Sequence, residues 1–284
     1  MTDVDGLTRF PLARRGFFMT SLISGLTLAT SRVEAQAIKT DATGLDAGEF
    51  QLAVPGGALP GYYARPTGAG PFPIVLVNEE IFGVHEYIKD TCRRFAKAGY
   101  LAVAVEVYAR LGDISKATDA SAIFRDFVNK APDATLMADL DALLAWAGAN
   151  KGDVARAAVT GFCRGGRTTW MYAIHNPKVK AAVAWYGQIV TPSTDIQPKS
   201  VLDLAGTLKV PLLGLYGGKD GSIKVDDVQA AAAKARTAGT AVEIVVYPEA
   251  GHAFHADYRP SYNAEAAADG FKRALAWFKS HGAA

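Results

Sequence analysis

The stretch Gly161-Phe162-Cys163-Arg164-Gly165-Gly166 decides the fold of this chain. A short apolar run at residues 157–160 leads into it, and a helix-like run begins near Gly165. Small residues two positions before and two positions after a nucleophile allow a sharp turn from a strand into a helix, which lifts the central side chain above the edge of the sheet. The stretch therefore predicts a nucleophile turn in which Cys163 takes the place that serine usually holds.

Asp220 and His252 follow Cys163 along the chain, at separations of 57 residues (220 − 163) and 32 residues (252 − 220). Each comes shortly after a run that predicts a strand, 210–216 for the aspartate and 242–247 for the histidine. Nucleophile, acid and histidine in this order are the chain order of the α/β-hydrolases. In such a triad the nucleophile attacks acyl carbon, the histidine holds its proton, and the acid orients the histidine.

Each of these residues also has a plainer interpretation. Cysteine is often a small buried hydrophobic residue, and aspartate in a glycine-rich turn often serves the turn itself. The glycines around Cys163, and the position of all three residues at the ends of strands, favour the catalytic interpretation. The other histidines are expected to have no catalytic role, because three lie on helical stretches at the surface and one follows no strand end of its own (His85, His175, His281 and His255).

Buried apolar runs and helical patterns alternate along most of the chain. The expected strands cover residues 49–54, 61–65, 74–77, 101–107, 157–160, 179–186, 210–216 and 242–247, and the expected helices cover 85–98, 132–149, 165 onward, 223–238 and 262–279. The first two strands flank a turn and are expected to form an antiparallel edge. The alternation predicts an α/β-hydrolase fold, with a mostly parallel sheet and helices on both faces. Ligands bind outside the carboxyl ends of the strands in such sheets.

The first 37 residues predict an export signal. Arg14-Arg15 precede an apolar run at residues 17–29, and residues 33–37 contain small residues that fit a cleavage site. This pattern is typical of a secretory signal, and the arginine pair indicates the Tat route. The alternative is a single membrane anchor, but the run is shorter than the roughly 20 residues that span a bilayer. We expect cleavage, transient contact with the Tat machinery, and a periplasmic or secreted protein without a stable membrane anchor.

Residues 38–284 then form a single domain of 247 residues (284 − 37). The chain is 50% hydrophobic and 20% charged with a formal net charge of +2, so nothing in it favours nucleic acid as a partner. Cys92 and Cys163 are too few for a disulfide framework, although a bridge between them stays open in an oxidising compartment. No metal-ligand spacing occurs, so no metal or cofactor is expected. The one loose stretch is 188–200.

Residues 78–83 follow the expected strand 74–77 at its carboxyl end. In α/β-hydrolases this loop supplies one hydrogen-bond donor to the oxyanion, and the backbone N–H of the residue after the nucleophile, here Arg164, supplies the other. Glu80 stands in this loop, where burial of a carboxylate requires a partner. A surface glutamate remains the alternative.

Several motifs together resemble the dienelactone hydrolase family, the carboxymethylenebutenolidases. The pair formed by Glu-Ile-Phe-Gly and Gly-x-Cys-x-Gly-Gly is specific, whereas either motif alone is weak. The matching stretches are 80–84, 101–110, 161–166, 185–187, 217–220 and 250–254, which span nearly all of the chain after the signal.

The resemblance implies a triad of Cys163, His252 and Asp220 that hydrolyses the enol-lactone ring of dienelactone. It also implies that Glu80 contacts the thiol and helps to keep the thiol unreactive until the substrate binds. No cofactor is implied.

The resemblance also assigns the groups around the triad. Ile81 and Arg164 would donate the two oxyanion N–H groups. Arg110 would grip a substrate carboxylate, for which a planar forked cation is suited, although a surface arginine is the alternative. Tyr186 and Phe254 stand in the matching stretches and are expected to line the substrate site.

The sequence departs from the family pattern in three ways. The family usually has a second substrate-binding arginine four residues after the histidine, and here that position holds Ala256, with His255 before it and Arg259 after it. The residue after the nucleophile is usually small or apolar, but here it is Arg164. Most enzymes of aromatic degradation are cytoplasmic, and this chain carries an export signal. These departures leave the natural substrate open.

The sequence thus predicts an exported hydrolase that cleaves a lactone or carboxylic ester, with a small-molecule substrate as its partner. Two alternatives remain. One is a broad-specificity carboxylesterase with no preference for dienelactone. The other is a binding protein that kept the fold and lost turnover, against which the arrangement of the triad argues.

Overall fold

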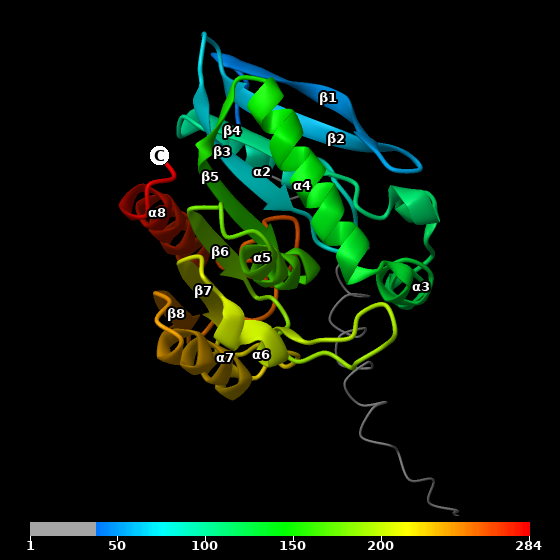
Figure 1. The fold of residues 1–284 in the computed structure, drawn as a ribbon, viewed down its shortest axis with the longest axis vertical. Coiled ribbons are helices and arrows are strands. Elements are labelled where there is room, and N and C mark those ends of the chain that lie inside the picture. Colours follow the sequence, from blue (N-terminus) through cyan, green and yellow to red (C-terminus); the bar gives the residue numbers. More distant parts are fainter. Residues whose placement is uncertain (1–37) are drawn as a thin grey trace, which may run out of the picture.

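The computed structural model describes residues 38–284, so the expected export signal lies outside the described residues. Eight strands form one sheet in the order β1-β2-β4-β3-β5-β6-β7-β8 (Figure 1). The strands are β1 Leu45–Val54, β2 Gly57–Pro66, β3 Phe72–Asn78, β4 Leu101–Val105, β5 Gly152–Phe162, β6 Ala181–Trp185, β7 Leu212–Gly217 and β8 Val242–Tyr247. The α-helices are α2 Glu86–Lys97, α3 Ala120–Asp126, α4 Asp133–Ala149, α5 Arg164–His175, α6 Val201–Leu204, α7 Val225–Thr237 and α8 Ala264–Ser280. Short 3₁₀ turns are η2 Ala109–Leu111, η3 Ile114–Lys116, η4 Val128–Lys130 and η5 Ala205–Thr207.

The sheet is antiparallel at one edge and parallel elsewhere, as expected. β1 pairs with β2 and β2 pairs with β4 in antiparallel fashion, whereas the neighbours from β4 through β3 to β8 pair in parallel. All carboxyl ends of the parallel strands therefore meet at one edge. Loops that follow β3, β5, β7 and β8 can bring distant residues together there.

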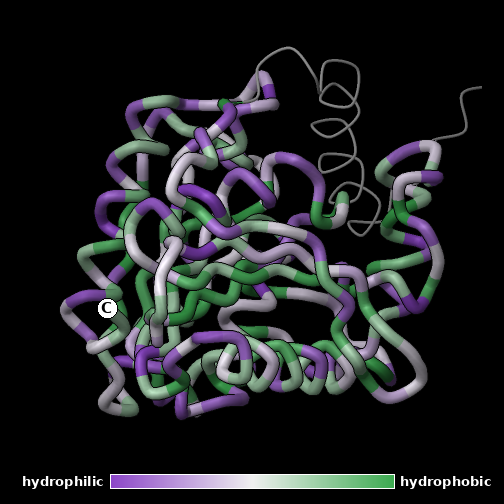
Figure 2. Tube along the Cα trace, turned by 90° about the horizontal axis from the view of Figure 1, so that it is seen from above, coloured by the Kyte–Doolittle hydropathy of each residue, from purple (hydrophilic) through white to green (hydrophobic). Residues whose placement is uncertain are grey.

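Helices cover both faces of the sheet. α2 and α8 lie on one face, where the rings of Phe95 and Phe278 have centroids 6.0 Å apart. α4 and α5 lie together on the opposite face, as Figure 1 shows. Figure 2 shows hydrophobic strands through the middle of the molecule and hydrophilic segments around the outside, which is the pattern of a sheet buried on both faces.

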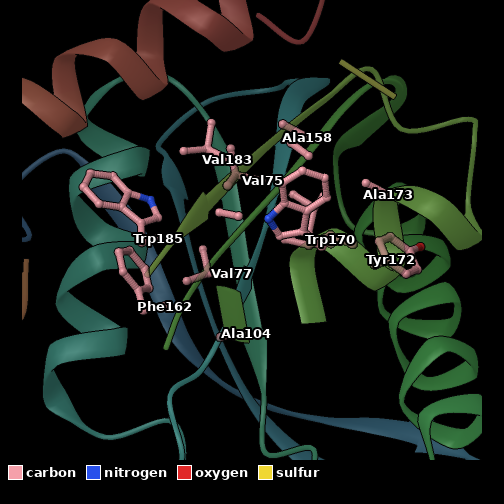
Figure 3. Packing of buried hydrophobic residues seen from close by; sticks show 14 of the residues in the cluster. Val75, Val77, Ala104, Ala158, Phe162, Trp170, Tyr172, Ala173, Val183 and Trp185 are labelled. Carbon is pink, nitrogen blue, oxygen red and sulfur yellow. The ribbon is translucent and has the colours of Figure 1, made fainter. Parts of the chain in front are cut away.

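Buried aromatic side chains pack beneath the nucleophile turn. In Figure 3, Phe162 and Trp185 lie beside one another, apart from Trp170 and Tyr172 of α5. The rings of Phe162 and Trp185 are stacked with centroids 5.4 Å apart, and both residues are fully buried. Full burial of a phenylalanine side chain contributes about 1.5–3 kcal/mol, so Cys163 directly follows a residue that is fixed in the core.

The expected elements are present, but β1, β2 and β5 begin four or five residues earlier than the sequence predicted. β4 ends at Val105 rather than at 107. The sequence pattern missed α3 and α6, which have seven and four residues and are too short for a helical period to show. The loose stretch 188–200 contains neither helix nor strand, as expected. Within residues 38–284 no helix is both long and apolar enough to cross a membrane.

Candidate active site

The turn after β5 has the geometry that its glycines predict. Cys163 has φ 55° and ψ −115°, a strained conformation for a residue with a side chain. A Cβ atom on Gly165 would lie 2.3 Å from the Asn78 carbonyl oxygen, and one on Gly161 would lie 2.4 Å from the Gly165 carbonyl oxygen. Only glycine permits these close approaches. The nucleophile turn at residues 161–166, called the elbow below, thus packs directly against the loop that follows β3.

The structure brings Cys163, His252 and Asp220 together. His252 Nε2 lies 3.2 Å from Cys163 Sγ, and His252 Nδ1 lies 2.7 Å from Asp220 Oδ2. The cysteine and the aspartate are almost fully buried, whereas the histidine side chain is 19% exposed. A proton can therefore move between sulfur and the imidazole while the carboxylate fixes the ring.

The charges of this arrangement favour a protonated imidazole. Burial lowers the pKa of His252, but the charges of Cys163 and Asp220 outweigh burial and raise this pKa to about 10. Burial acts to raise the pKa of Asp220, yet His252 and Ser222 hold it below its ordinary value. A protonated imidazole beside the sulfur of Cys163 is the arrangement that activates a cysteine nucleophile.

Ser222 is a supporting residue that the sequence expectations did not include. Its hydroxyl donates to Asp220 Oδ1 at 2.6 Å, and its backbone N–H donates to the same oxygen at 2.9 Å. The backbone N–H of Ile223 adds a third bond at 3.2 Å. A serine two residues after an aspartate in a turn is the signal that could have predicted it. These bonds leave Asp220 Oδ2 free for His252.

The two expected oxyanion donors come from segments in contact. Arg164 is the first residue of α5, so its backbone N–H has no partner within the helix. Ile81 is fully buried in the loop after β3, whose first residues touch the elbow at Gly165. The convergence of the two N–H groups above Cys163 stays a prediction.

Glu80 is fully buried, and its charge is balanced by a cluster of neighbours. The Tyr258 hydroxyl donates to Glu80 Oε2 at 2.5 Å, Arg259 Nη2 lies 3.5 Å from Oε1, and His85 Nε2 lies 3.8 Å from Oε2. Burial acts to raise the pKa of Glu80, but Arg259 above all, with His85 and Tyr258, lowers it to about 2. Glu80 is therefore a buried carboxylate with partners rather than a surface residue. Its expected contact with the thiol stays a prediction.

Two residues of this cluster differ from the sequence expectations. His85 was expected at the surface, but its side chain is only 24% exposed because it packs beside Glu80 and against the ring of Tyr258. Tyr258 had no signal in the sequence, because it lies in an irregular loop with no periodicity. Arg259 also packs over the Phe82 ring, 5.0 Å from its centroid.

The residues at and around position 256, where the family usually has an arginine, differ in whether they can bind a substrate carboxylate. Ala256 is fully buried, so an arginine side chain has no room at this position. His255 is buried in the core, where its Nδ1 lies 2.7 Å from the Tyr87 hydroxyl, and burial with the charge of Arg94 lowers its pKa to about 3. A neutral histidine is a poor partner for a carboxylate. Arg259 is a cation, but it is already paired with Glu80.

The expected substrate-binding residues fall in different surroundings. Both Arg110 η-nitrogens donate to Asp139 of α4, one of them at 2.6 Å to Oδ1, so Arg110 already has a carboxylate partner. The Tyr186 ring lies 5.2 Å from the His252 ring and also 5.2 Å from the Phe254 ring. Tyr186 therefore borders the site, and Phe254 packs behind it. The roles of these residues in substrate binding stay predictions.

Both cysteines are free thiols, so the bridge between Cys92 and Cys163 does not form in this structure. Cys92 is fully buried on α2, and burial raises the pKa of its thiol. Within the described part of the chain, no group of three or more histidine, cysteine, aspartate or glutamate side chains is arranged to hold a metal ion.

The sheet order, the helices on both faces and the nucleophile turn after β5 place the protein among the α/β-hydrolases. The sequence profile of the dienelactone hydrolase family matches residues 59–282. The chain belongs to the dienelactone hydrolase family and is a hydrolase.

Individual relatives match over nearly their whole length. A protein of Methylorubrum extorquens named "Putative carboxymethylenebutenolidase" is 54% identical over 275 residues, which cover 96% of this chain and 94% of the relative. One of Escherichia coli with the same name is 48% identical over 260 residues, which cover 91% of this chain and 96% of the relative. A crystal structure of a "Putative Dienelactone Hydrolase" from Klebsiella pneumoniae has a TM-score of 0.81 and 52% identity, and covers 83% of this chain and 98% of that chain.

Proposed function

We propose that this protein hydrolyses the ester bond of a lactone or carboxylic ester through an acyl intermediate on Cys163. The observation that carries the proposal is the continuous contact from Cys163 Sγ to His252 Nε2 at 3.2 Å and from His252 Nδ1 to Asp220 Oδ2 at 2.7 Å. The carboxymethylenebutenolidase name of the relatives favours an enol lactone that bears a carboxylate as the substrate.

The first half of the reaction transfers the acyl group to sulfur. The Cys163 thiolate attacks the carbonyl carbon, a C–S bond forms, and the carbonyl electron pair moves onto oxygen. The backbone N–H groups of Ile81 and Arg164 stabilise that oxyanion. When the carbonyl re-forms, the C–O ester bond breaks, and the leaving oxygen takes the proton from His252 Nε2. With a lactone, the ring opens and the leaving oxygen stays on the same acyl chain.

The second half releases the product. Neutral His252 accepts a proton from water, and the hydroxide attacks the thioester carbon. The C–S bond breaks, the carboxylic acid leaves, and Cys163 is again a thiolate beside protonated His252. The net change is the addition of one water molecule across the ester bond. Asp220 keeps its negative charge throughout and stabilises the imidazolium.

A panel of substrates tests the proposal. Enol lactones with a carboxylate, neutral lactones and chromogenic esters are compared by kcat/KM, with products identified by mass spectrometry, and Cys163→Ala serves as the inactive control. We expect the carboxylated enol lactones to be the best substrates. A preference for simple neutral esters would instead support the broad-specificity carboxylesterase. Binding without turnover of any member would support the non-catalytic interpretation.

We also propose that the protein is exported by the Tat route. The support is the sequence alone, namely Arg14-Arg15 before an apolar run and small residues at 33–37. Fractionation of cells that express the full chain tests the proposal, with Arg14→Lys/Arg15→Lys as the matched variant. Activity outside the cytoplasm for the wild type only is expected, and an equal distribution of both proteins would contradict export by this route.

A further inference from the structure

Arg164 carries a buried hydrogen-bonding edge without a partner. Its side chain is 5% exposed, and among residues 38–284 neither its Nε nor its Nη2 has a hydrogen-bond acceptor. These two nitrogens form one edge of the planar guanidinium, an edge that holds a carboxylate through two parallel N–H bonds. Arg125 uses this edge on Asp126, with bonds of 3.0 Å from Nε and 2.5 Å from Nη2. The same edge of Arg164 is free.

The nearest carboxylate is already used by another arginine. Asp133, the first residue of α4, accepts from Arg167 Nη1 at 2.7 Å and from Nη2 at 2.8 Å, one bond on each oxygen. Arg164 Nη2 lies 3.8 Å from Asp133 Oδ1, beyond hydrogen-bond distance. Two buried guanidinium groups thus share one carboxylate, and one positive charge remains in excess.

A buried excess charge is unfavourable unless an anion joins it. Burial and the neighbouring Arg167 lower the pKa of Arg164, while Tyr108, which also forms a hydrogen bond with the Arg164 side chain, and Asp133 act in the opposite direction. A carboxylate on the free edge would satisfy both unpaired N–H groups and balance the charge. The cluster of Arg164, Arg167 and Asp133 therefore suits a small planar anion.

The free edge belongs to the residue next to the nucleophile. Arg164 directly follows Cys163 in the chain, and its side chain interacts with the hydroxyl of Tyr108, a residue after β4 that is 1% exposed. Arg110, the residue that the family resemblance assigns to a substrate carboxylate, already has Asp139 as its partner.

We propose that the Nε–Nη2 edge of Arg164 binds a carboxylate group of the substrate while the neighbouring Cys163 attacks the carbonyl carbon. Arg164 is then the residue that selects anionic over neutral esters and lactones. This inference rests on the proposed function, since it takes Cys163 as the nucleophile. Arg164, which lies on the elbow, would then take the role of the arginine that the family usually has at position 256.

A pair of alkylating reagents of nearly equal shape tests the proposal. Iodoacetate carries a carboxylate and iodoacetamide does not, so the ratio of their rates at Cys163 measures attraction of an anion beside the thiol. Peptide mass spectrometry separates Cys163 from buried Cys92. We expect Arg164→Gln and Arg164→Met to lower the ratio by about tenfold or more, since a charge-assisted hydrogen bond is lost. The kcat/KM ratio for matched carboxylated and neutral esters should fall by about 10- to 100-fold in parallel.

Two arginine variants serve as comparisons. Arg156→Gln removes the same formal charge near the start of β5, at the end of the strand remote from Cys163, and should leave the ratio within about twofold of the wild type because exposed charges are screened. An unchanged ratio in both Arg164 variants would overturn the proposal. A ratio that falls in Arg110→Gln but not in Arg164→Gln would overturn it as well, because the anion then binds at Arg110.

A measurement on the wild type covers the case in which the Arg164 variants fail to fold. Acetate should slow the alkylation of Cys163 by iodoacetamide more than acetamide does at the same concentration, and equal protection would overturn the proposal. Failure of the proposed function looks different. If Cys163 reacts with iodoacetamide no faster than free cysteine, Cys163 is not an activated nucleophile, whatever the ratio of the two reagents.

Discussion

Arg259→Met should destabilise the protein markedly, because it removes the cation from a buried ion pair. Arg259 Nη2 lies 3.5 Å from Glu80 Oε1, and the exposed fractions of the two side chains are 4% and 0%. Methionine keeps an unbranched apolar stem, but it leaves the Glu80 carboxylate without its cation. Removing one partner of a buried ion pair costs about 3–5 kcal/mol.

Arg156→Met is the matched control for this substitution. Arg156 pairs with Asp153 near the start of β5, and the exposed fractions of the two side chains are 35% and 27%. Water screens an ion pair as open to solvent as this one, so the pair adds little to stability. The control therefore makes the same change of side chain without leaving a buried charge behind.

The pKa of Glu80 gives the scale of the stabilisation by all the partners of this carboxylate, among which Arg259 contributes most. This pKa falls from its ordinary 4.5 to about 2 in the folded protein. At about 1.4 kcal/mol per pKa unit, the difference is worth about 3 kcal/mol. Because the folded-state pKa is the lower one, the stabilisation is present above about pH 4.5 and is lost as the pH falls toward 2.

Urea unfolding at about pH 7 measures the effect. We expect Arg259→Met to lose about 3 kcal/mol of the free energy of unfolding, while the control Arg156→Met stays close to the wild type. The double variant Glu80→Gln/Arg259→Met should lose less than the sum of the two single variants, since neither leaves a lone charge once both are gone. A loss below about 1 kcal/mol for Arg259→Met, or simple additivity in the cycle, would refute the pairing of Glu80 with Arg259.

Three further predictions concern single positions. Cys92→Ala should leave kcat/KM within about twofold of the wild type, because Cys92 lies on α2 away from the triad, and steady-state kinetics checks this. Glu80→Gln should change the dependence of Cys163 alkylation on pH, because loss of a nearby negative charge favours the thiolate, and an identical iodoacetamide profile from about pH 5 to 9 would separate Glu80 from the thiol. Gly165→Ala should lower stability and activity together, since the new Cβ would lie 2.3 Å from the Asn78 carbonyl oxygen, and normal unfolding and turnover would contradict the close packing of the elbow.

The sequence predicted the elements that depend on local patterns. Buried strands such as β3 and β7 are continuous apolar runs, and the elbow is indicated by Gly161 and Gly165, because each glycine serves a close backbone approach. The positions of Asp220 and His252 followed from chain order and from the shared edge of a parallel sheet. Each of these features can be recognised from a short stretch of sequence.

The partners of charged residues could not be predicted in this way. Glu80 pairs with Tyr258 and Arg259 across 178 and 179 residues of chain, and Arg110 pairs with Asp139 on another element. Such pairs depend on how loops fold over the sheet edge, which no periodicity records. The burial of Ala256 is of the same kind, since it follows from the packing of an irregular loop.

The most direct test of the central claim is to trap the acyl group on Cys163 during turnover. A slowly hydrolysed chromogenic ester is mixed with the enzyme, the reaction is quenched in acid, and the peptide that contains Cys163 is weighed by mass spectrometry. The mass of one acyl group on this peptide is expected in the wild type, together with a burst of leaving group. Cys163→Ala should lose both, with turnover lower by about 10⁴-fold or more. An unmodified Cys163 during steady turnover, or a Cys163→Ala variant within about tenfold of the wild type, would contradict the account.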